Sequence, residues 1–173
     1  MANMFKAPSN FDHNEWFILV SMLLLLIAFI KMPKSMPKDL TLSIFLFFAV
    51  IGLNADVLMA ASYPFDFYTI TDSPKLEIFD VLVYIVNYSI YGYFFAWILS
   101  KWKMGAGVFG LFIICWSGLT TLIEWTSVKF RVFTYINGWT TAYSSLCYLF
   151  IFFFSAAVIK SLFYIWDYDA RAD

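Results

Sequence analysis

Charged residues are scarce in this sequence of 173 residues: only 13% are Asp, Glu, Lys or Arg, whereas 62% are hydrophobic and 23% aromatic. Soluble domains are nearer one quarter charged and one half apolar, so the composition excludes an ordinary soluble protein. The net charge of -1 also lacks the basic excess that nucleic-acid binding requires. We therefore expect an integral membrane protein that contacts membrane lipid and has no nucleic-acid partner.

Histidine and cysteine are nearly absent as well. The one histidine, His13, excludes haem ligation by two histidines of one subunit and the paired histidines of a zinc protease. The two cysteines, Cys115 and Cys147, lie in apolar runs and are interpreted as small core hydrophobes, with a disulfide as the alternative. No nucleophile triad or phosphate-binding loop occurs in the sequence. We therefore expect no cofactor and no metal site, and the sequence offers no support for an enzyme.

Five apolar stretches approach the ~20 residues that a helix needs to cross a bilayer. They predict helices at about 14–32, 40–61, 78–99, 105–126 and 142–166, separated by segments with Pro, Gly or charge, of which 62–77 and 128–141 are the longest. The first stretch ends in Lys31-Met32-Pro33 without a small-residue cleavage site, so we expect it to remain as a membrane anchor. The predicted fold class is all-α: a polytopic transmembrane helix bundle in one membrane domain, 1–173.

The distribution of Lys and Arg predicts the orientation of the bundle. One side of the membrane would collect seven of these residues and the other side four: Lys31, Lys34, Lys38, Lys101, Lys103, Lys160 and Arg171 against Lys6, Lys75, Lys129 and Arg131. Because the cytoplasmic side carries the positive excess, we expect the N-terminus outside and the C-terminus inside. Tryptophans at the predicted helix ends support the same frame, with Trp139 expected at the outer interface.

Polar side chains inside the apolar helices are the candidate functional residues, because such groups are costly in lipid. Asp56, beside Asn54 in the second helix, is the deepest acid. In the third helix Asp80, Tyr84, Asn87 and Tyr91 are spaced four, three and four, which places them on one α-helical stripe. The fourth helix has a similar stripe: Ser117, Thr120, Thr121 and Glu124.

These stripes predict an outward-open polar site. Asp56, Asp80 and Glu124 lie at comparable depth near the outer ends of three helices, so we expect them to converge. The candidate ligand-binding residues are Asp56, Asp80, Glu124, Asn54, Tyr84, Asn87, Tyr91 and Thr120. Alternatively, Asp80 and Glu124 are solvated or paired with Lys129 or Arg131, and the neutral polar residues are interhelical hydrogen-bond partners.

A glycine motif in the fourth helix has a structural interpretation. Gly105-Ala106-Gly107-Val108-Phe109-Gly110 matches the dinucleotide pattern G-x-G-x-x-G, but no strand precedes it and no βαβ unit surrounds it. We interpret these small residues as permitting close helix packing.

Three segments together resemble a known group of proteins. They are His13-Asn14-Glu15-Trp16-Phe17-Ile18, the Lys/Pro loop after it, and Tyr135-Ile136-Asn137-Gly138-Trp139. The chain resembles a group of small five-helix integral membrane proteins of unknown function from Bacillus- and Clostridium-type bacteria. The resemblance implies a bacterial cytoplasmic membrane protein with multiple passes, and it supplies no catalytic residues.

Three classes of function remain open. The leading hypothesis is a non-enzymatic sensing, transport or assembly subunit that uses the outer polar cluster, with a membrane-protein partner or a second copy of itself. A substrate-binding subunit of a vitamin-type uptake transporter is the first alternative, although such subunits usually have six helices and an Ala-x-x-x-Ala motif that is absent here. The second is a membrane-embedded lipid-modifying enzyme, in which Asp56 or Glu124 would be the base.

Overall fold

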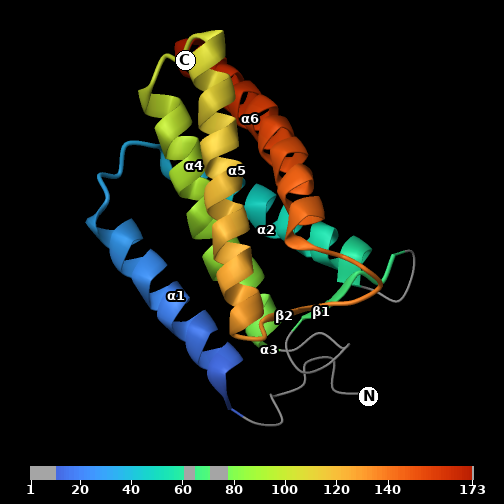
Figure 1. The fold of residues 1–173 in the computed structure, drawn as a ribbon. Coiled ribbons are helices and arrows are strands. Elements are labelled where there is room, and N and C mark those ends of the chain that lie inside the picture. The colour runs from blue at the N-terminus through green and yellow to red at the C-terminus, as the bar shows by residue number, and fades with distance from the viewer. Residues whose placement is uncertain (1–10, 61–64, 71–77, 173) are drawn as a thin grey trace, which may run out of the picture.

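The computed structural model describes residues 11–60, 65–70 and 78–172, and the side chains of 78 and 168–172 lie outside that description. In chain order the elements are α1 (His13–Lys31), α2 (Lys38–Ala60), β1 (Tyr68–Ile70), α3 (Ile78–Leu82), the π-helix η1 (Val83–Tyr88), α4 (Ser89–Lys101), α5 (Ala106–Lys129), β2 (Phe133–Tyr135) and α6 (Thr141–Ala172) (Figure 1). Since α3, η1 and α4 are continuous, the described residues contain five helices that are long and apolar enough to cross a membrane. The expected helical class and helix count are confirmed.

The ends of α1 show how local chemistry sets the helix boundaries. Asp12 is the N-cap residue, and its side chain accepts a hydrogen bond from the Asn14 amide. Glu15 reaches back to accept from the Asp12 amide at 2.8 Å, which completes a capping box. At the other end Met32 is extended, because the residue before a proline, here Pro33, disfavours the α conformation. The helix therefore ends where the Lys/Pro loop begins.

Four helices share one apolar core. Its buried members come from α2, α4, α5 and α6: Leu40, Ile44, Phe48, Tyr93, Phe95, Ala96, Ile113, Phe152, Ala156 and Ile159. Helix α1 lies at the edge of the bundle, where it packs on η1 and α4 (Figure 1). Large apolar side chains also cover the outside of the bundle, including Ile30 and Phe150, which are 72% and 77% exposed. An apolar exterior of this kind is suited to lipid rather than water.

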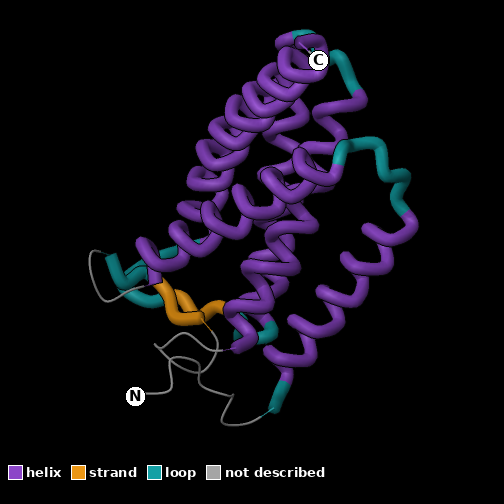
Figure 2. Tube along the Cα trace, turned by 180° about the vertical axis from the view of Figure 1, so that it is seen from behind, coloured by secondary structure: helices purple, strands orange, loops and turns teal. Residues whose placement is uncertain are grey.

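A two-stranded antiparallel sheet closes one end of the bundle. Strand β1 lies in the connection between α2 and α3, and β2 in the connection between α5 and α6, with Tyr68 opposite Tyr135 and Ile70 opposite Phe133. Figure 2 shows this sheet at the end where α2 and α5 finish and α6 begins. We call it the strand end. From the sequence, segments 62–77 and 128–141 are expected only to separate helices, and neither strand is predicted.

The turn after β2 packs against the segment before β1, so the α2–α3 and α5–α6 connections contact each other outside the sheet as well. The Ile136 amide donates to the Phe67 carbonyl at 2.8 Å, and the rings of Phe67 and Trp139 stack with their centroids 4.4 Å apart. The Asn137 amide group donates to the Asp66 carbonyl at 2.7 Å. Asp66 and Asn137 both have positive φ, a conformation that Asn and Asp tolerate better than most residues do. Side-chain contacts therefore stabilise the sheet in addition to the backbone hydrogen bonds between its strands.

The third span contains a π-helix that the spacing analysis did not foresee. Over Val83–Tyr88 the helix is wider than an α-helix, so a residue spacing that defines one face of an α-helix no longer does so. The Ser89 hydroxyl donates to the Tyr84 carbonyl, five residues earlier, and to the Phe45 carbonyl of α2. The expected single stripe of Asp80, Tyr84, Asn87 and Tyr91 is therefore divided between different neighbours.

Two further expectations were wrong. A Cβ atom built on Gly105, Gly107 or Gly110 would meet nothing within 4 Å, so these glycines permit no close packing of helices within the chain. Cys115 is exposed on the surface of α5 and Cys147 is half-buried on α6; both are free thiols. In a chain surrounded by lipid, an apolar sequence context does not distinguish core from outer surface, because both are apolar.

Candidate functional site

Asp56 is buried near the end of α2, with 7% of its surface exposed. Both of its carboxylate oxygens accept hydrogen bonds from tyrosines. The Tyr68 hydroxyl donates to Oδ1 at 2.6 Å and the Tyr88 hydroxyl to Oδ2 at 3.3 Å. The donors come from β1 and η1, so three separate segments meet at this carboxylate.

Gly52 of α2 leaves the space that Tyr88 occupies. A Cβ atom at position 52 would overlap the Tyr88 ring, so only glycine permits η1 to approach this closely. Tyr88 also packs edge-on against Tyr84, with ring centroids 5.7 Å apart. Tyr84 is buried and interacts with the carboxylates of both Asp56 and Asp80. The π-helix thus directs two tyrosines toward the acid of the neighbouring helix.

Glu124 is the second buried carboxylate, with 6% exposure near the end of α5. Its Oε1 accepts from the Tyr135 hydroxyl of β2 at 2.5 Å and from the Ser144 hydroxyl of α6 at 2.7 Å. The Trp139 indole in turn donates to Ser144 at 2.9 Å.

The two carboxylates belong to one network. Tyr148 of α6 is half-buried; it interacts with Glu124 through a side-chain hydrogen bond, and with Asp56 and Tyr135 only electrostatically. The charges of both Asp56 and Glu124 also act on the Tyr68 hydroxyl and raise its pKa. Asp80 is 3% exposed and interacts electrostatically with Asp56. We call this set the acid–tyrosine network: Asp56, Asp80, Glu124, Tyr68, Tyr84, Tyr88, Tyr135, Tyr148 and Ser144.

The two strand tyrosines have perturbed hydroxyls. Burial, followed by the nearby Asp56 carboxylate, raises the pKa of Tyr68 well above its usual value of 10.0. Burial, followed by the hydrogen bond to Glu124, raises the pKa of Tyr135 to about 12. Both effects favour the neutral phenol, so each hydroxyl remains a hydrogen-bond donor over the ordinary pH range.

The partners of Asp56 and Glu124 within the described chain are neutral hydroxyls. The ion pair of Glu124 with Lys129 or Arg131, which was part of the alternative interpretation, is not formed: both cations are exposed, and the Lys129 ammonium lies over the Trp125 ring at 5.3 Å. Hydroxyl donors stabilise a carboxylate but do not neutralise its charge. The network therefore contains acidic groups without a matching cation at Asp56 or Glu124.

Several of the expected site residues lie elsewhere. Asn54 is exposed and donates only to the Val50 carbonyl of its own helix at 2.7 Å. Asn87 faces α1, where its amide group donates to the Ser21 hydroxyl at 2.9 Å. Tyr91 and Thr120 share a hydrogen bond of 2.8 Å that joins α4 to α5. Asn87, Tyr91 and Thr120 are thus interhelical hydrogen-bond partners, which for Asn87 and Thr120 is the alternative interpretation.

Five members of the network were missed by sequence reasoning: Tyr68, Tyr88, Tyr135, Tyr148 and Ser144. Tyr68 and Tyr135 lie in segments that were treated as breaks, and their pairing depends on contact between distant parts of the chain. Tyr88 follows Tyr84 by four residues, a spacing that could have suggested a shared face. For Tyr148, one of many aromatic residues in α6, the sequence carries no such signal.

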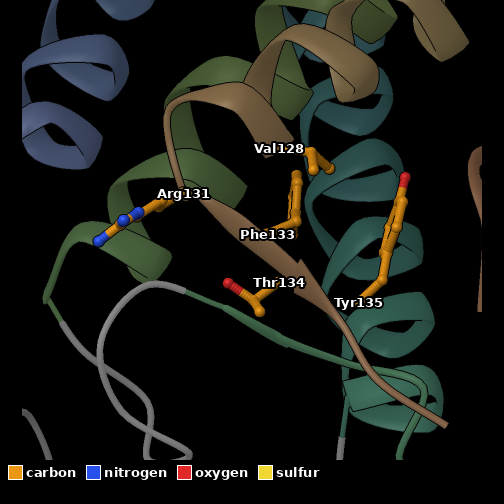
Figure 3. Close-up of a pocket in the computed structure, with 5 residues that line it drawn as sticks. All are labelled: Val128, Arg131, Phe133, Thr134 and Tyr135. Atoms are coloured by element: carbon orange, nitrogen blue, oxygen red, sulfur yellow. The ribbon is translucent and has the colours of Figure 1, made fainter.

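A hollow beside β2 brings the network near the surface. It has a volume of about 570 Å³ and is lined by Val128, Arg131, Phe133, Thr134 and Tyr135 (Figure 3). Figure 3 shows Phe133 and Tyr135 leaving the strand on the same side, as alternate residues of a strand do. A second hollow of about 380 Å³ adjoins Arg131 on the side of Asp12 and His13. Tyr135 therefore lines a surface hollow and also contacts Glu124.

The described residues contain no group of three His, Cys, Asp or Glu side chains that could hold a metal ion. The three acids of the network are thus linked through tyrosines rather than gathered around one point. No protein-family model, curated protein or solved structure matches this chain.

Proposed function

We propose that this protein is a non-enzymatic membrane subunit that recognises a ligand or partner through the acid–tyrosine network, as part of sensing, transport or assembly. One observation carries the proposal: Asp56 and Glu124 are both buried, and each accepts a hydrogen bond from one of the two tyrosines, Tyr68 and Tyr135, that pair in the sheet. Buried ionisable groups in membrane-spanning helices are costly and are usually retained for function. Packing alone would be served equally well by apolar residues at these two positions.

The same proposal includes an orientation and a location. The strand end faces the outside of a bacterial cytoplasmic membrane, with the N-terminus outside. The Lys and Arg excess on the opposite side supports this orientation. Trp139 stacks on Phe67 at the strand end, and a tryptophan near a helix end supports assigning that end to a membrane interface; the resemblance noted from the sequence supports the bacterial membrane.

Purification of matched variants tests the proposal. Wild type, Asp56→Asn, Asp80→Asn, Glu124→Gln and the control Asp39→Asn are isolated from membranes in mild detergent. Native mass spectrometry then records the subunits and small molecules that each retains. Asp39 is exposed at the opposite end of α2, so its variant removes a carboxylate without touching the network.

We expect wild type and Asp39→Asn to retain the same ligand or partner, and the network variants to lose it while remaining monodisperse and helical. Retention by all three network variants contradicts the proposal. So does a wild-type protein that carries neither ligand nor partner.

A further inference from the structure

The turn after α5 has an arginine at a position where helices usually have glycine. Phe130 is the C-cap residue of α5, and the next amide, that of Arg131, donates to the Val128 carbonyl at 3.1 Å. The Val132 amide donates to the Ser127 carbonyl at 2.9 Å, which completes a Schellman motif. Such a motif commonly has glycine after the cap, whereas here Arg131 adopts the positive φ of 58°. The turn alone would therefore favour glycine at position 131.

Lys129 and Arg131 form an exposed pair of cations at this turn. Neither forms an ion pair with another residue of the described chain, and the Lys129 ammonium lies over the Trp125 ring. The negative end of the α5 dipole favours positive charge at the end of the helix. The dipole does not account for the shape of the surface around that charge, which is set by the two hollows beside Arg131.

The two hollows meet at Arg131. The larger one extends toward β2, where Thr134 and Tyr135 line it. The smaller one extends toward the start of α1 and is lined by Asp12, His13, Lys129, Phe130 and Arg131. It contains one acid, the N-cap Asp12, against two cations, so its lining has a positive excess. Figure 3 shows the Arg131 side chain pointing away from Tyr135, so the guanidinium lies apart from the acid–tyrosine network.

Exposed aromatic rings lie beside these cations on the membrane side. Trp125 is one turn before Lys129 on α5 and is 50% exposed, and Trp16 in the first turn of α1 is 59% exposed. Phe130 stacks on Phe17 of α1 with ring centroids 4.8 Å apart, which joins the two helix ends. Both helices are long and apolar enough to cross a membrane, so the smaller hollow lies where their spans end. Tryptophan is typical of the headgroup level of a bilayer.

We propose that Lys129 and Arg131 bind the headgroup phosphate of an anionic phospholipid in the leaflet at the strand end. Arg131 supplies a planar fork that matches two phosphate oxygens, and Lys129 supplies a point charge. The position favours a lipid over a soluble anion, because only a lipid also covers the exposed rings of Trp125 and Phe130. The inference goes beyond the proposed function and does not require the acid–tyrosine network to bind anything.

Lipid titration of the whole protein in mild detergent, followed by native mass spectrometry, tests the inference. Dioleoyl phosphatidylglycerol is compared with dioleoyl phosphatidylcholine, which has the same chains and a phosphate but no net charge. The variants are Arg131→Gly, Lys129→Gln and the control Lys103→Gln, at an exposed cation of the opposite end. We expect wild type and Lys103→Gln to prefer phosphatidylglycerol. Each strand-end variant should bind it about fivefold more weakly, which corresponds to about 1 kcal/mol for one basic residue.

Arg131→Gly separates binding from folding. Glycine adopts a positive φ without strain, so this variant should unfold at a temperature no lower than wild type while binding less phosphatidylglycerol. If it is less stable, Lys129→Gln, at an exposed side chain, carries the test. Equal affinity of wild type for the two lipids, or undiminished phosphatidylglycerol binding by Lys129→Gln and Arg131→Gly, overturns the inference. Calorimetric titration with inorganic phosphate should show no binding; phosphate binding that Arg131→Gly abolishes would establish a soluble-anion site and overturn the lipid assignment.

Discussion

Tyr68 and Tyr135 lie directly opposite each other in the two-stranded sheet, and each donates its hydroxyl to a different buried carboxylate. Residues paired in this way project from the same face of an antiparallel sheet. One pair of side chains therefore connects the sheet to Asp56 of α2 and to Glu124 of α5. The sheet fixes the positions of both acids relative to each other.

Removal of one of these hydroxyls has a predictable effect on stability. Tyr68→Phe deletes a buried donor to the Asp56 carboxylate, and hydrogen bonds to charged groups contribute about 1.5–3 kcal/mol. We expect the free energy of unfolding to fall by that amount, measured by denaturant titration in mild detergent. The control is Tyr164→Phe, at a side chain that is 74% exposed, with a change within about 0.5 kcal/mol. Equal stability of the two variants contradicts the prediction.

Gly52 and Gly118 form a matched pair of helical glycines. A Cβ atom at Gly52 would overlap the Tyr88 ring, whereas one at Gly118 would meet nothing within 4 Å. We expect Gly52→Ala to destabilise the protein by about 1–3 kcal/mol through overpacking. Gly118→Ala should be neutral or stabilise by up to about 1 kcal/mol, because Ala favours helix more than Gly does. Thermal unfolding of both variants measures the difference, and a stable Gly52→Ala would show that α2 and η1 can separate at little cost.

Alkaline pH should weaken the strand end. An unfolded tyrosine ionises near pH 10, whereas folding raises the pKa of Tyr135 to about 12. Its contribution to stability is therefore complete below about pH 10 and is lost as the pH rises towards about 12. Melting temperatures measured across this range should fall less steeply for Tyr135→Phe than for Tyr164→Phe. Parallel curves would show that Tyr135 ionises as a free phenol does.

Substitution of two asparagines compares a hydrogen bond between helices with one inside a single helix. Asn87 bonds Ser21 of α1, whereas Asn54 bonds only its own helix. Interhelical bonds of this kind contribute about 0.6 kcal/mol on average, so Asn87→Ala should lower the unfolding free energy by about that amount. Asn54→Ala should have no comparable effect. The comparison uses the same denaturant titration, and a larger loss at Asn54 would reverse the assignment.

Cysteine labelling tests the orientation. In a background with Cys115→Ala and Cys147→Ala, Asn137→Cys places a thiol at the strand end and Lys103→Cys at the opposite end; both parent side chains are exposed. We expect a membrane-impermeant maleimide applied to intact cells to label position 137 and not position 103. Labelling of position 103 alone would invert the proposed orientation.

Long-range pairing explains most of what the sequence did not reveal. The helices were predictable because a chain in lipid must satisfy its backbone within each span, which requires long apolar runs. Asp56 and Glu124 could be selected as candidate site residues because each is an acid within such an apolar run. Their partners could not be selected in this way, since β1 and β2 pair across the helices α3 to α5, and no local spacing encodes that contact.

The π-helix explains the remaining errors. The stripe that joined Asp80 to Asn87 assumed an α-helical turn throughout, but the turn is wider over Val83–Tyr88. Asn87 therefore faces α1, while Tyr84 and Tyr88 reach Asp56. Spacing rules fail wherever the helix itself changes type.

The order of the strands along the chain also limits when the site can form during biosynthesis. Strand β1 emerges before α3, and β2 emerges only after α5. Closing this contact requires the intervening helices to be in place, so it belongs to the late, non-local steps of folding. Before β2 emerges, Glu124 also has no Tyr135 donor. A nascent chain halted before β2 would therefore expose an incomplete site, which makes the tyrosine pair a marker of finished membrane assembly.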